Sequence, residues 1–492
     1  DLWSLAGNWN GLVPVPGDAL VFGGTTRLTS VNDTPADTSF SGMTFDESAG
    51  SFTLSGNGIT LGGDLTSRSA SSQTIDLDMI MPATRTFSLL SGDVNVGGNI
   101  SGGGGLDKVG RGTLILSGTN TYSGDTSVNG GRLVVDYSGA SDTAAPLDNG
   151  RVWLRMGELV LKGKTTGVTT ETMNRLYMGS YNGASNTLRL DANGGDGIHL
   201  TITDFFGNAD NSGHSLMSHL IDLSSSAGNS VTVNGLSSYS AVYNGVLMQS
   251  ISGSGRANLV VRDANGYGFA TLSGSTSGAI GRLTTGTTLD ATNTDASTNF
   301  FLASGTVSRT ADLGFSTITI DSTAGDVVLD MGAHDLVMGA SGRAILVSGD
   351  NDVSITGSGK FSSQLVLCLH NYSSGTFTFG LDTRSDGDSR LAVGGTGLTV
   401  WTGVSTEKGT SRKDGIRING GVFRPTADQD WVSGTNVHVS VSGGAVLEIG
   451  ADLNGTTADD LSNPVGDHGS GSNITFWGDS GLRFDRMFRP IR

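Results

Sequence analysis

The chain contains many short stretches in which apolar and polar residues alternate. Examples are Val94–Val96, Leu188–Leu190 and Phe377–Phe379, and residues such as glycine, serine, asparagine and aspartate separate one stretch from the next. Successive side chains of a strand point to opposite faces of a sheet, so this alternation predicts short β-strands with one buried face. The pattern continues from about residue 41 to about residue 480 and predicts an all-β chain.

The clearest example of this organisation is the stretch 104–135. It contains three predicted strands, at 113–116, 126–128 and 132–135, with turn residues between them. Three strands and three turns in about thirty residues form one coil of chain that cannot bury its apolar side alone. Similar coils must therefore stack above and below it, which predicts a solenoid.

The spacing of particular residues in this stretch forms a motif. Its members are Lys108, Gly110, Gly112, Leu114, Leu116, Gly118, Asn120, Tyr122, Gly124, Gly131, Leu133 and Val135. The stretch resembles the passenger-associated repeat of bacterial autotransporter-like surface proteins, over about 32 of the 492 residues. The resemblance implies an extracellular, right-handed parallel β-helix that is usually one part of a larger surface protein. It also implies that the motif residues shape turns and strand ladders and take no part in catalysis.

We expect three regions along the chain. Residues 1–40 contain Trp3, Trp9 and a proline pair before the alternation begins, and we interpret them as an N-terminal cap over the exposed end of the solenoid. This segment also resembles the N-terminal part of β-helical surface proteins that carry the repeat. Residues 41–480 are expected to form one single-stranded parallel β-helix, a rod roughly 100 Å long with some twenty coils. Residues 481–492 form a tail rich in arginine and phenylalanine.

Three segments interrupt the alternation. Residues 169–180 are expected to hold one helical turn, residues 204–220 a longer excursion with His214 and His219, and residues 381–390 a charged turn. Insertions of this kind gather as loops on one face of a solenoid, where function often lies.

Composition and charge narrow the possible partners. The chain has 77 glycines and a formal net charge of −17, with 29 basic and 46 acidic residues. Such a surface repels nucleic acid and anionic membranes.

We expect no cofactor, although turn carboxylates can recruit weakly held calcium, and Asp382–Asp388 begins like a calcium loop. Arg384 and Val393 replace two ligands that such a loop requires, so a self-neutralised turn is the preferred interpretation.

The cysteine content and the length of the apolar runs give information on where in or outside the cell the protein is found. Cys368 lies in an apolar run and is expected to be buried; one cysteine allows no disulfide within the chain. No apolar run reaches the length of a membrane span. The chain opens on Asp1-Leu2-Trp3 without a signal peptide, so we expect a mature or excised segment whose anchor lies elsewhere.

Catalytic and metal sites are the main alternatives to a structural role. His214 and His219 are five residues apart, so we expect solvent-facing loop histidines rather than a zinc site, and we expect His438 to point outward. Many β-helices cleave polysaccharides with clustered acidic and basic residues or paired carboxylates. The candidates for such a site are Asp76 with Asp78, Asp107 with Lys108 and Arg111, and Asp459 with Asp460.

The C-terminal tail contrasts with the acidic body. We hypothesise that Arg483, Phe484, Arg486, Phe488 and Arg489 dock on another copy, at the end that carries Trp3 and Trp9; a frayed end is the alternative. Joining the top of one copy to the bottom of the next does not close and builds a filament.

These observations favour an extracellular structural protein at the bacterial cell surface, a fibre subunit or adhesin stalk that joins head to tail, and not an enzyme. A secreted polysaccharide lyase or glycoside hydrolase is the second hypothesis. The third is a passenger that binds surface glycans through Trp3, Trp9, Trp153, Trp401, Trp431 or Trp477.

Overall fold

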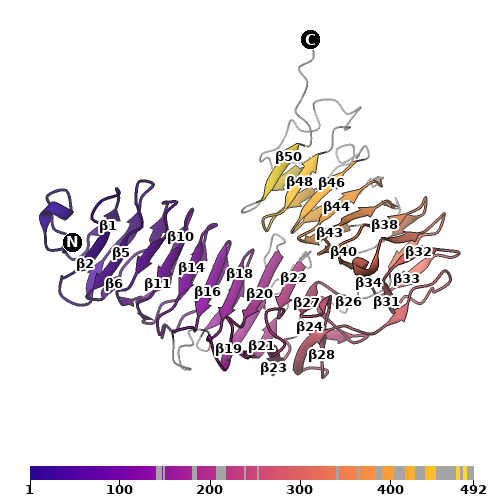
Figure 1. Ribbon diagram of the computed structural model, residues 1–492, viewed down its shortest axis with the longest axis horizontal. Coiled ribbons are helices and arrows are strands. Elements are labelled where there is room, and N and C mark those ends of the chain that lie inside the picture. Colours follow the sequence, from indigo (N-terminus) through magenta and orange to yellow (C-terminus); the bar gives the residue numbers. More distant parts are fainter. Residues whose placement is uncertain are drawn as a thin grey trace, which may run out of the picture.

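The computed structural model describes residues 1–139, 147, 150–179, 185–206, 218–237, 240–251, 254–338, 343–362, 366–383, 390–403, 416–426, 438–449, 473–476 and 480–484. It is a parallel β-solenoid of about 15 turns, which confirms the predicted fold class. The solenoid is not one straight rod. It forms two arms, and the second arm turns back over the last coils of the first (Figure 1).

The first arm stacks parallel strands in three ladders, which we name A, B and C. Ladder B contains β1 (Ala19–Phe22), β4 (Gly42–Phe45), β7 (Leu65–Ser67), β10 (Arg85–Leu89), β13 (Leu106–Val109), β15 (Thr126–Asn129), β17 (Arg151–Leu154), β19 (Val168–Met178), β21 (Gly197–Phe206) and β23 (Ser230–Val233). Ladder A contains β2 (Thr29–Asn32), β5 (Thr53–Gly56), β8 (Gln73–Ile75), β11 (Val94–Val96), β14 (Thr113–Leu116), β16 (Arg132–Asp136), β18 (Glu158–Lys162), β20 (Ser185–Asp191), β22 (Ser218–Asp222) and β27 (Leu259–Asp263). Ladder C contains β3 (Thr38–Phe40), β6 (Ile59–Leu61), β9 (Met79–Ile80) and β12 (Ile100–Ser101).

The second arm repeats this arrangement in ladders E, F and G. Ladder E contains β30 (Thr287–Thr288), β31 (Asn299–Leu302), β34 (Thr317–Asp321), β37 (Ala344–Ser348), β40 (Val366–Asn371), β43 (Arg390–Gly395), β45 (Ile416–Ile418), β47 (His438–Val441) and β49 (Asn473–Phe476). Ladder F contains β32 (Gly305–Ser308), β35 (Val327–Asp330), β38 (Val353–Thr356), β41 (Thr376–Phe379), β44 (Leu398–Trp401), β46 (Val422–Pro425), β48 (Val446–Ile449) and β50 (Gly481–Phe484). Ladder G contains β33 (Leu313–Phe315), β36 (Leu336–Met338), β39 (Lys360–Ser362) and β42 (Asp382–Thr383). Two short 3₁₀ turns, η1 (Ala6–Asn8) and η2 (Ser322–Ala324), are the helical elements of the described residues.

Antiparallel strands separate the two arms, and we call them the elbow. They are β24 (Ser240–Tyr243), β25 (Val246–Ile251), β26 (Ser254–Arg256), β28 (Gly266–Leu272) and β29 (Gly278–Arg282). Strand β28 folds back on β27, and β29 pairs antiparallel with β23, so both long ladders of the first arm end here. The change of strand direction stops the parallel stacking and allows the chain to turn.

Each arm has its own apolar interior, and a third cluster joins the arms. Inward residues of the ladders, such as Leu114 and Ile345, form the two long interiors. The third cluster places Leu346 and Cys368, on the outer face of ladder E, against Phe269 of β28. Strands β37 and β40 of ladder E are therefore buried on both faces, which explains their continuous apolar runs. Burial also raises the pKa of the Cys368 thiol to about 11.

The N-terminal segment closes the end of the first arm. Trp3 is fully buried there and its ring packs against Trp9, Phe22 and Phe40. The structure places the first coil, β1 to β3, already at residues 19–40, within the segment that we expected to act only as a cap.

Two interruptions predicted from the sequence differ in the structure. The expected helical turn at 169–180 is wrong: residues 168–178 form the long strand β19, because Thr169, Glu171 and Met173 alternate inward while β17 and β21 pair with it on both sides. His219 lies in strand β22 and is buried, so it is not a solvent-facing loop residue. His214, most of the 381–390 turn and the side chain of His438 lie outside the described residues. No helix in the described ranges is long and apolar enough to cross a membrane.

Candidate binding groove between the two arms

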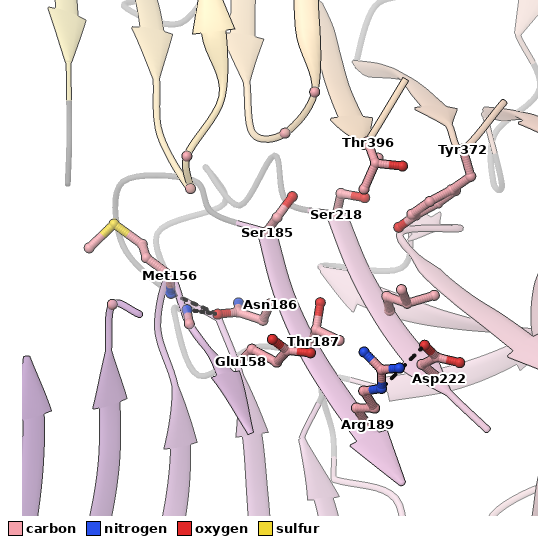
Figure 2. A pocket seen from close by; sticks show the side chains of 18 of the residues that line it. Met156, Glu158, Ser185, Asn186, Thr187, Arg189, Ser218, Asp222, Tyr372 and Thr396 are labelled. Carbon is pink, nitrogen blue, oxygen red and sulfur yellow. Dashed lines mark hydrogen bonds and ion pairs between the residues drawn. The ribbon is translucent and has the colours of Figure 1, made fainter. Parts of the chain in front are cut away.

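A groove of about 730 Å³ lies where the second arm folds over the first. One wall consists of corner turns of the first arm and the outer faces of β18, β20, β22 and β27 (Figure 2). The facing wall consists of corner turns of the second arm, including Gly395, Gly421 and Gly444. Clefts of several hundred cubic ångströms are the usual size for small-molecule sites.

A row of polar residues crosses four neighbouring strands of the groove in register. Arg189 of β20 pairs with Asp222 of β22, Asp222 with Arg262 of β27, and Arg262 with Tyr267 of β28. Leu188, Leu190 and Ile221 beside this row point into the solenoid, so the row points outward. The stacking of coils thus makes neighbours of side chains that are far apart in the sequence, because each lies on the strand next to the other.

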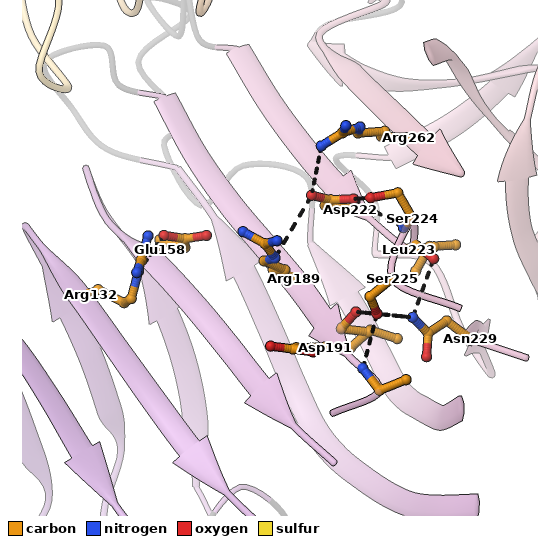
Figure 3. A network of polar contacts seen from close by, with 12 residues as sticks. Arg132, Glu158, Arg189, Asp191, Asp222, Leu223, Ser224, Ser225, Asn229 and Arg262 are labelled. Carbon is orange, nitrogen blue, oxygen red and sulfur yellow. Dashed lines mark hydrogen bonds and ion pairs between the residues drawn. The ribbon is translucent and has the colours of Figure 1, made fainter. Parts of the chain in front are cut away.

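The central carboxylate of this row is shared between two guanidinium groups. Asp222 Oδ2 lies 3.9 Å from Arg189 Nε and 3.5 Å from Arg262 Nη1 (Figure 3). Asp222 Oδ1 accepts hydrogen bonds from the backbone N–H and the hydroxyl of Ser224. The Asp222 side chain is 6% exposed, whereas both arginine side chains are 41% exposed. The three charges leave one net positive charge, and guanidinium N–H groups face solvent.

Two stacked tyrosines close one end of the row. The rings of Tyr267 and Tyr372 lie 4.6 Å apart and nearly parallel, and the Arg262 guanidinium carbon lies 5.2 Å from the centre of the Tyr267 ring. Burial raises the pKa of both phenols, so both remain neutral donors at physiological pH. Tyr267 belongs to the elbow and Tyr372 follows β40, so this stack joins the two arms.

Buried polar contacts hold the arms together below the groove. His370 contacts the Ser218 hydroxyl through Nδ1 and the Ala257 carbonyl through Nε2, both at 2.9 Å. Burial lowers the pKa of His370 to about 4, and burial together with His370 lowers that of His219 to about 3. A neutral His370 then donates from Nε2 and accepts from Ser218. A side chain at Gly394 would place its Cβ 2.3 Å from Cβ of Ser218, so glycine permits this close approach.

The two carboxylates of the groove are both held by arginines. Glu158 is ion-paired with Arg132 at 2.6 Å, and Arg189 lies between Glu158 and Asp222 (Figures 2 and 3). Strand geometry places Glu158 and Asp222 about 12 Å apart at Cα, two strands across and two residues along. Each carboxylate is therefore the partner of at least one guanidinium group.

The catalytic candidates from the sequence lie elsewhere. Asp76 and Asp78 are both exposed, and Asp78 accepts a hydrogen bond from the backbone of Asn99. Asp107 is bonded to Asn129, and Arg111 is exposed. Asp459 and Asp460 lie outside the described residues. No three potential metal-ligating side chains converge within the part of the chain that the structure describes, and calcium binding stays a prediction.

The motif residues of the stretch 104–135 make structural contacts. Lys108 is buried, and its Nζ donates to the carbonyls of Val109, Gly110 and Gly130, which face one another at a corner turn. The Asn120 side chain accepts a hydrogen bond from the Ile100 backbone. A further hydrogen bond joins the Tyr122 hydroxyl to Thr126. Gly110 and Gly131 adopt positive φ, and their corners line the groove.

The predicted docking and glycan-binding residues are only partly exposed. Trp3 cannot contact another copy or a glycan in this fold, because its ring is fully buried; Trp401 is buried in the same way. Trp153 is half-buried, with its ring stacked on Tyr177 at 4.0 Å and Arg155 over it. Arg483 and Phe484 belong to β50, which pairs with β48, so the tail begins as a regular strand. Arg486, Phe488, Arg489 and Trp431, together with Trp477, lie outside the described residues.

Sequence reasoning missed Arg189, Asp222, Arg262 and the two tyrosines. A signal exists in the sequence for Arg189 alone, which occupies the outward position of the predicted strand Leu188–Leu190. The convergence of these residues, however, depends on coil register and on the turn at the elbow, and neither follows from local alternation.

Comparison with known proteins supports the resemblance of the stretch 104–135. Residues 106–135 match the family model of the Passenger-associated-transport-repeat, which confirms the predicted repeat. The chain is 33% identical over 128 residues to the Adhesin BmaC autotransporter of Brucella suis biovar 1 (strain 1330), covering 26% of this chain and 3% of that protein. It is 59% identical over 44 residues to an Extracellular serine protease of Serratia marcescens, covering 9% of this chain and 4% of that protein. The chain thus matches only a few per cent of the length of these relatives. No solved structure matches it.

Proposed function

We propose that this chain is the β-solenoid part of a secreted or surface-exposed bacterial passenger that acts in attachment. The observation that carries this proposal is the parallel solenoid together with the passenger repeat at residues 106–135. The similarity to an autotransporter whose name includes adhesin supports it. A solenoid gains stability lengthwise and presents long outer faces, which suits contact over a broad surface.

Attachment is tested by displaying the chain on a non-adherent bacterial strain. The expected result is attachment to host-cell monolayers or glycan-coated surfaces several-fold above that of the parent strain. A displayed solenoid of unrelated sequence is the control, and an antibody confirms equal surface density. Attachment equal to the control at equal density would contradict the proposal.

We further propose that copies join head to tail into a fibre. Among the described strands, β50 is the last of its ladder and pairs with β48 alone, and the acidic chain complements an arginine-rich tail. Sedimentation of the purified chain should show assemblies that a version with Arg486 and Arg489 both changed to glutamate does not form. A wild-type chain that sediments only as a monomer would argue against this joining.

A further inference from the structure

The outward row Arg189–Asp222–Arg262, with the tyrosine stack beside it, has the properties of a ligand site that the solenoid itself does not require. Charged outer residues of a solenoid normally pair one to one, as Arg132 does with Glu158 and Lys162 with Asp136. Here the guanidinium groups of Arg189 and Arg262 share one oxygen of Asp222. The other oxygen of Asp222 accepts hydrogen bonds from Ser224. The row therefore has a surplus of cationic donors.

The surplus donors face a bounded space. Both arginine side chains are 41% exposed, and both line the groove of about 730 Å³ between the arms. Guanidinium groups bind carboxylate and sulfate oxygens through paired hydrogen bonds. An anionic group of a ligand would lie between Arg189 and Arg262 on the solvent side. Each arginine would then contact Asp222 on one side and the ligand anion on the other.

Other features of the groove indicate the rest of the ligand. The near wall presents the Thr187 hydroxyl and the facing wall that of the exposed Thr396, so hydroxyl groups of a ligand find both donors and acceptors. The Tyr267–Tyr372 stack supplies an amphipathic end wall, apolar along the rings and polar at the hydroxyls. Hydroxyl partners on both walls, one anionic position and an aromatic end wall suit a sugar chain better than a peptide.

We infer that the groove between the arms binds an acidic saccharide, whose carboxylate or sulfate group is held by Arg189 and Arg262. This inference rests on the proposed attachment function and specifies its ligand class. The acidic body of the protein repels such a ligand over most of its surface, so we expect it to bind at the row, where two arginines share one aspartate.

Calorimetry on the purified full chain tests the inference with defined probes. The probes are an oligogalacturonate (carboxylate), a heparin tetrasaccharide (sulfate), cellotetraose (neutral) and a hexaglutamate peptide (anionic but not a sugar). We expect binding of at least one acidic saccharide, weakened by salt, and much weaker binding of cellotetraose and the peptide. The two acidic probes distinguish which anion the arginines hold. Equal binding of the peptide, or no binding of either acidic saccharide, would overturn the inference.

Variants connect the binding to the groove. Arg189→Gln and Arg262→Gln should each weaken binding about tenfold, and the double variant more strongly, because each removes a charged hydrogen-bond donor. The matched control is Arg175→Gln: Arg175 is an equally exposed arginine of β19, paired with Asp204 at 3.6 Å outside the groove. Unchanged affinity in the double variant would overturn the inference, provided that its circular dichroism and melting temperature match the wild type.

The attachment assay separates this inference from the proposed function. If the displayed double variant attaches as well as the wild type, the groove is not the binding site and the attachment function stands. If the wild type binds the saccharide in solution but confers no attachment, the site stands and the attachment function fails.

Discussion

The outer faces of ladders A and E show how one kind of coil serves two purposes. Along most of ladder A, outward residues such as Val134 and Arg132 are partly or fully exposed, and the strands alternate between apolar and polar positions. In strands β37 and β40 of ladder E, outward residues such as Leu346 are as buried as inward ones, because the elbow packs against them. The difference shows that the outer face of a solenoid can be buried against another part of the chain while its coils keep the same arrangement of strands.

The largest effect is expected when a charged residue replaces an outward apolar residue in each of the two ladders. Leu346→Asp should destabilise the junction by about 4 kcal/mol, because the carboxylate would be buried against β28 without a charged partner. Val134→Asp, on the outer face of ladder A, should cost less than about 1 kcal/mol. Urea unfolding followed by circular dichroism measures the loss, and hydrogen exchange of β28 amides shows whether it lies at the junction. Equal effects of the two substitutions would contradict the difference between the faces.

Acid should weaken the coils at the junction of the two arms, where His370 of β40 and His219 of β22 are buried. A histidine has a pKa near 6.5 when unfolded, whereas burial lowers that of His370 to about 4 among Ser218, the Ala257 carbonyl, the Phe269 ring and His219. Between pH 6.5 and 4 the unfolded chain takes up a proton that the folded chain does not. The contribution of His370 to stability is therefore full above pH 6.5 and falls by about 3 kcal/mol as the pH approaches 4, and His219 adds a loss of similar size.

Melting temperatures measured from pH 7.5 to 4 test this dependence. His370→Gln should reduce the slope of the profile by about half, because His219 still contributes, although the substitution also lowers stability at neutral pH through its lost contacts. His199→Gln, at an exposed position of β21, is the control and should leave the profile unchanged. A profile with the same slope in the His370 variant would argue against this residue as the source.

The smallest test compares two cross-strand ion pairs with the same register. Arg132 pairs with Glu158 between β16 and β18, and Arg424 pairs with Glu448 between β46 and β48. The Glu158 side chain is 21% exposed and that of Glu448 is 4% exposed. Arg424→Gln should therefore cost about 2 kcal/mol and Arg132→Gln about 0.5 kcal/mol, since exposed pairs contribute little and buried carboxylates lose a charged partner. Urea midpoints compare the two, and the reverse order would contradict the burial argument.

Much of the fold follows from local pattern, because a coil needs only alternation and turn residues. In the stretch 104–135 the three predicted strands agree with β14, β15 and β16 within about one residue. The prediction of one coil was wrong, because β13 was missed and the pairing of β13 with β15 and of β14 with β16 makes two stacked coils. Strand β19 was misassigned because Thr-Thr-Glu-Thr-Met lacks obvious apolar alternation, and only the pairing with its two neighbours identifies it as a strand.

The elbow and the groove were beyond prediction from local pattern. The unbroken apolar run around Cys368 does indicate a strand buried on both faces, but it does not say which surface covers it. The covering surface comes from β28, about a hundred residues earlier in the chain. Arg189, Asp222 and Arg262 become neighbours only once the coils are counted and stacked, so one error in register would separate them.

The elbow also determines how the molecule responds to mechanical tension. A pull that separates the free ends of the two arms acts through each arm as a lever, because the coils within an arm are held along their whole length by strand pairing. The force then acts mainly on the small apolar cluster around Leu346 and Phe269, and it separates ladder E from β28 starting at one edge of this cluster. Under tension the molecule therefore lengthens first by opening at its bend, while both stacks of coils stay intact.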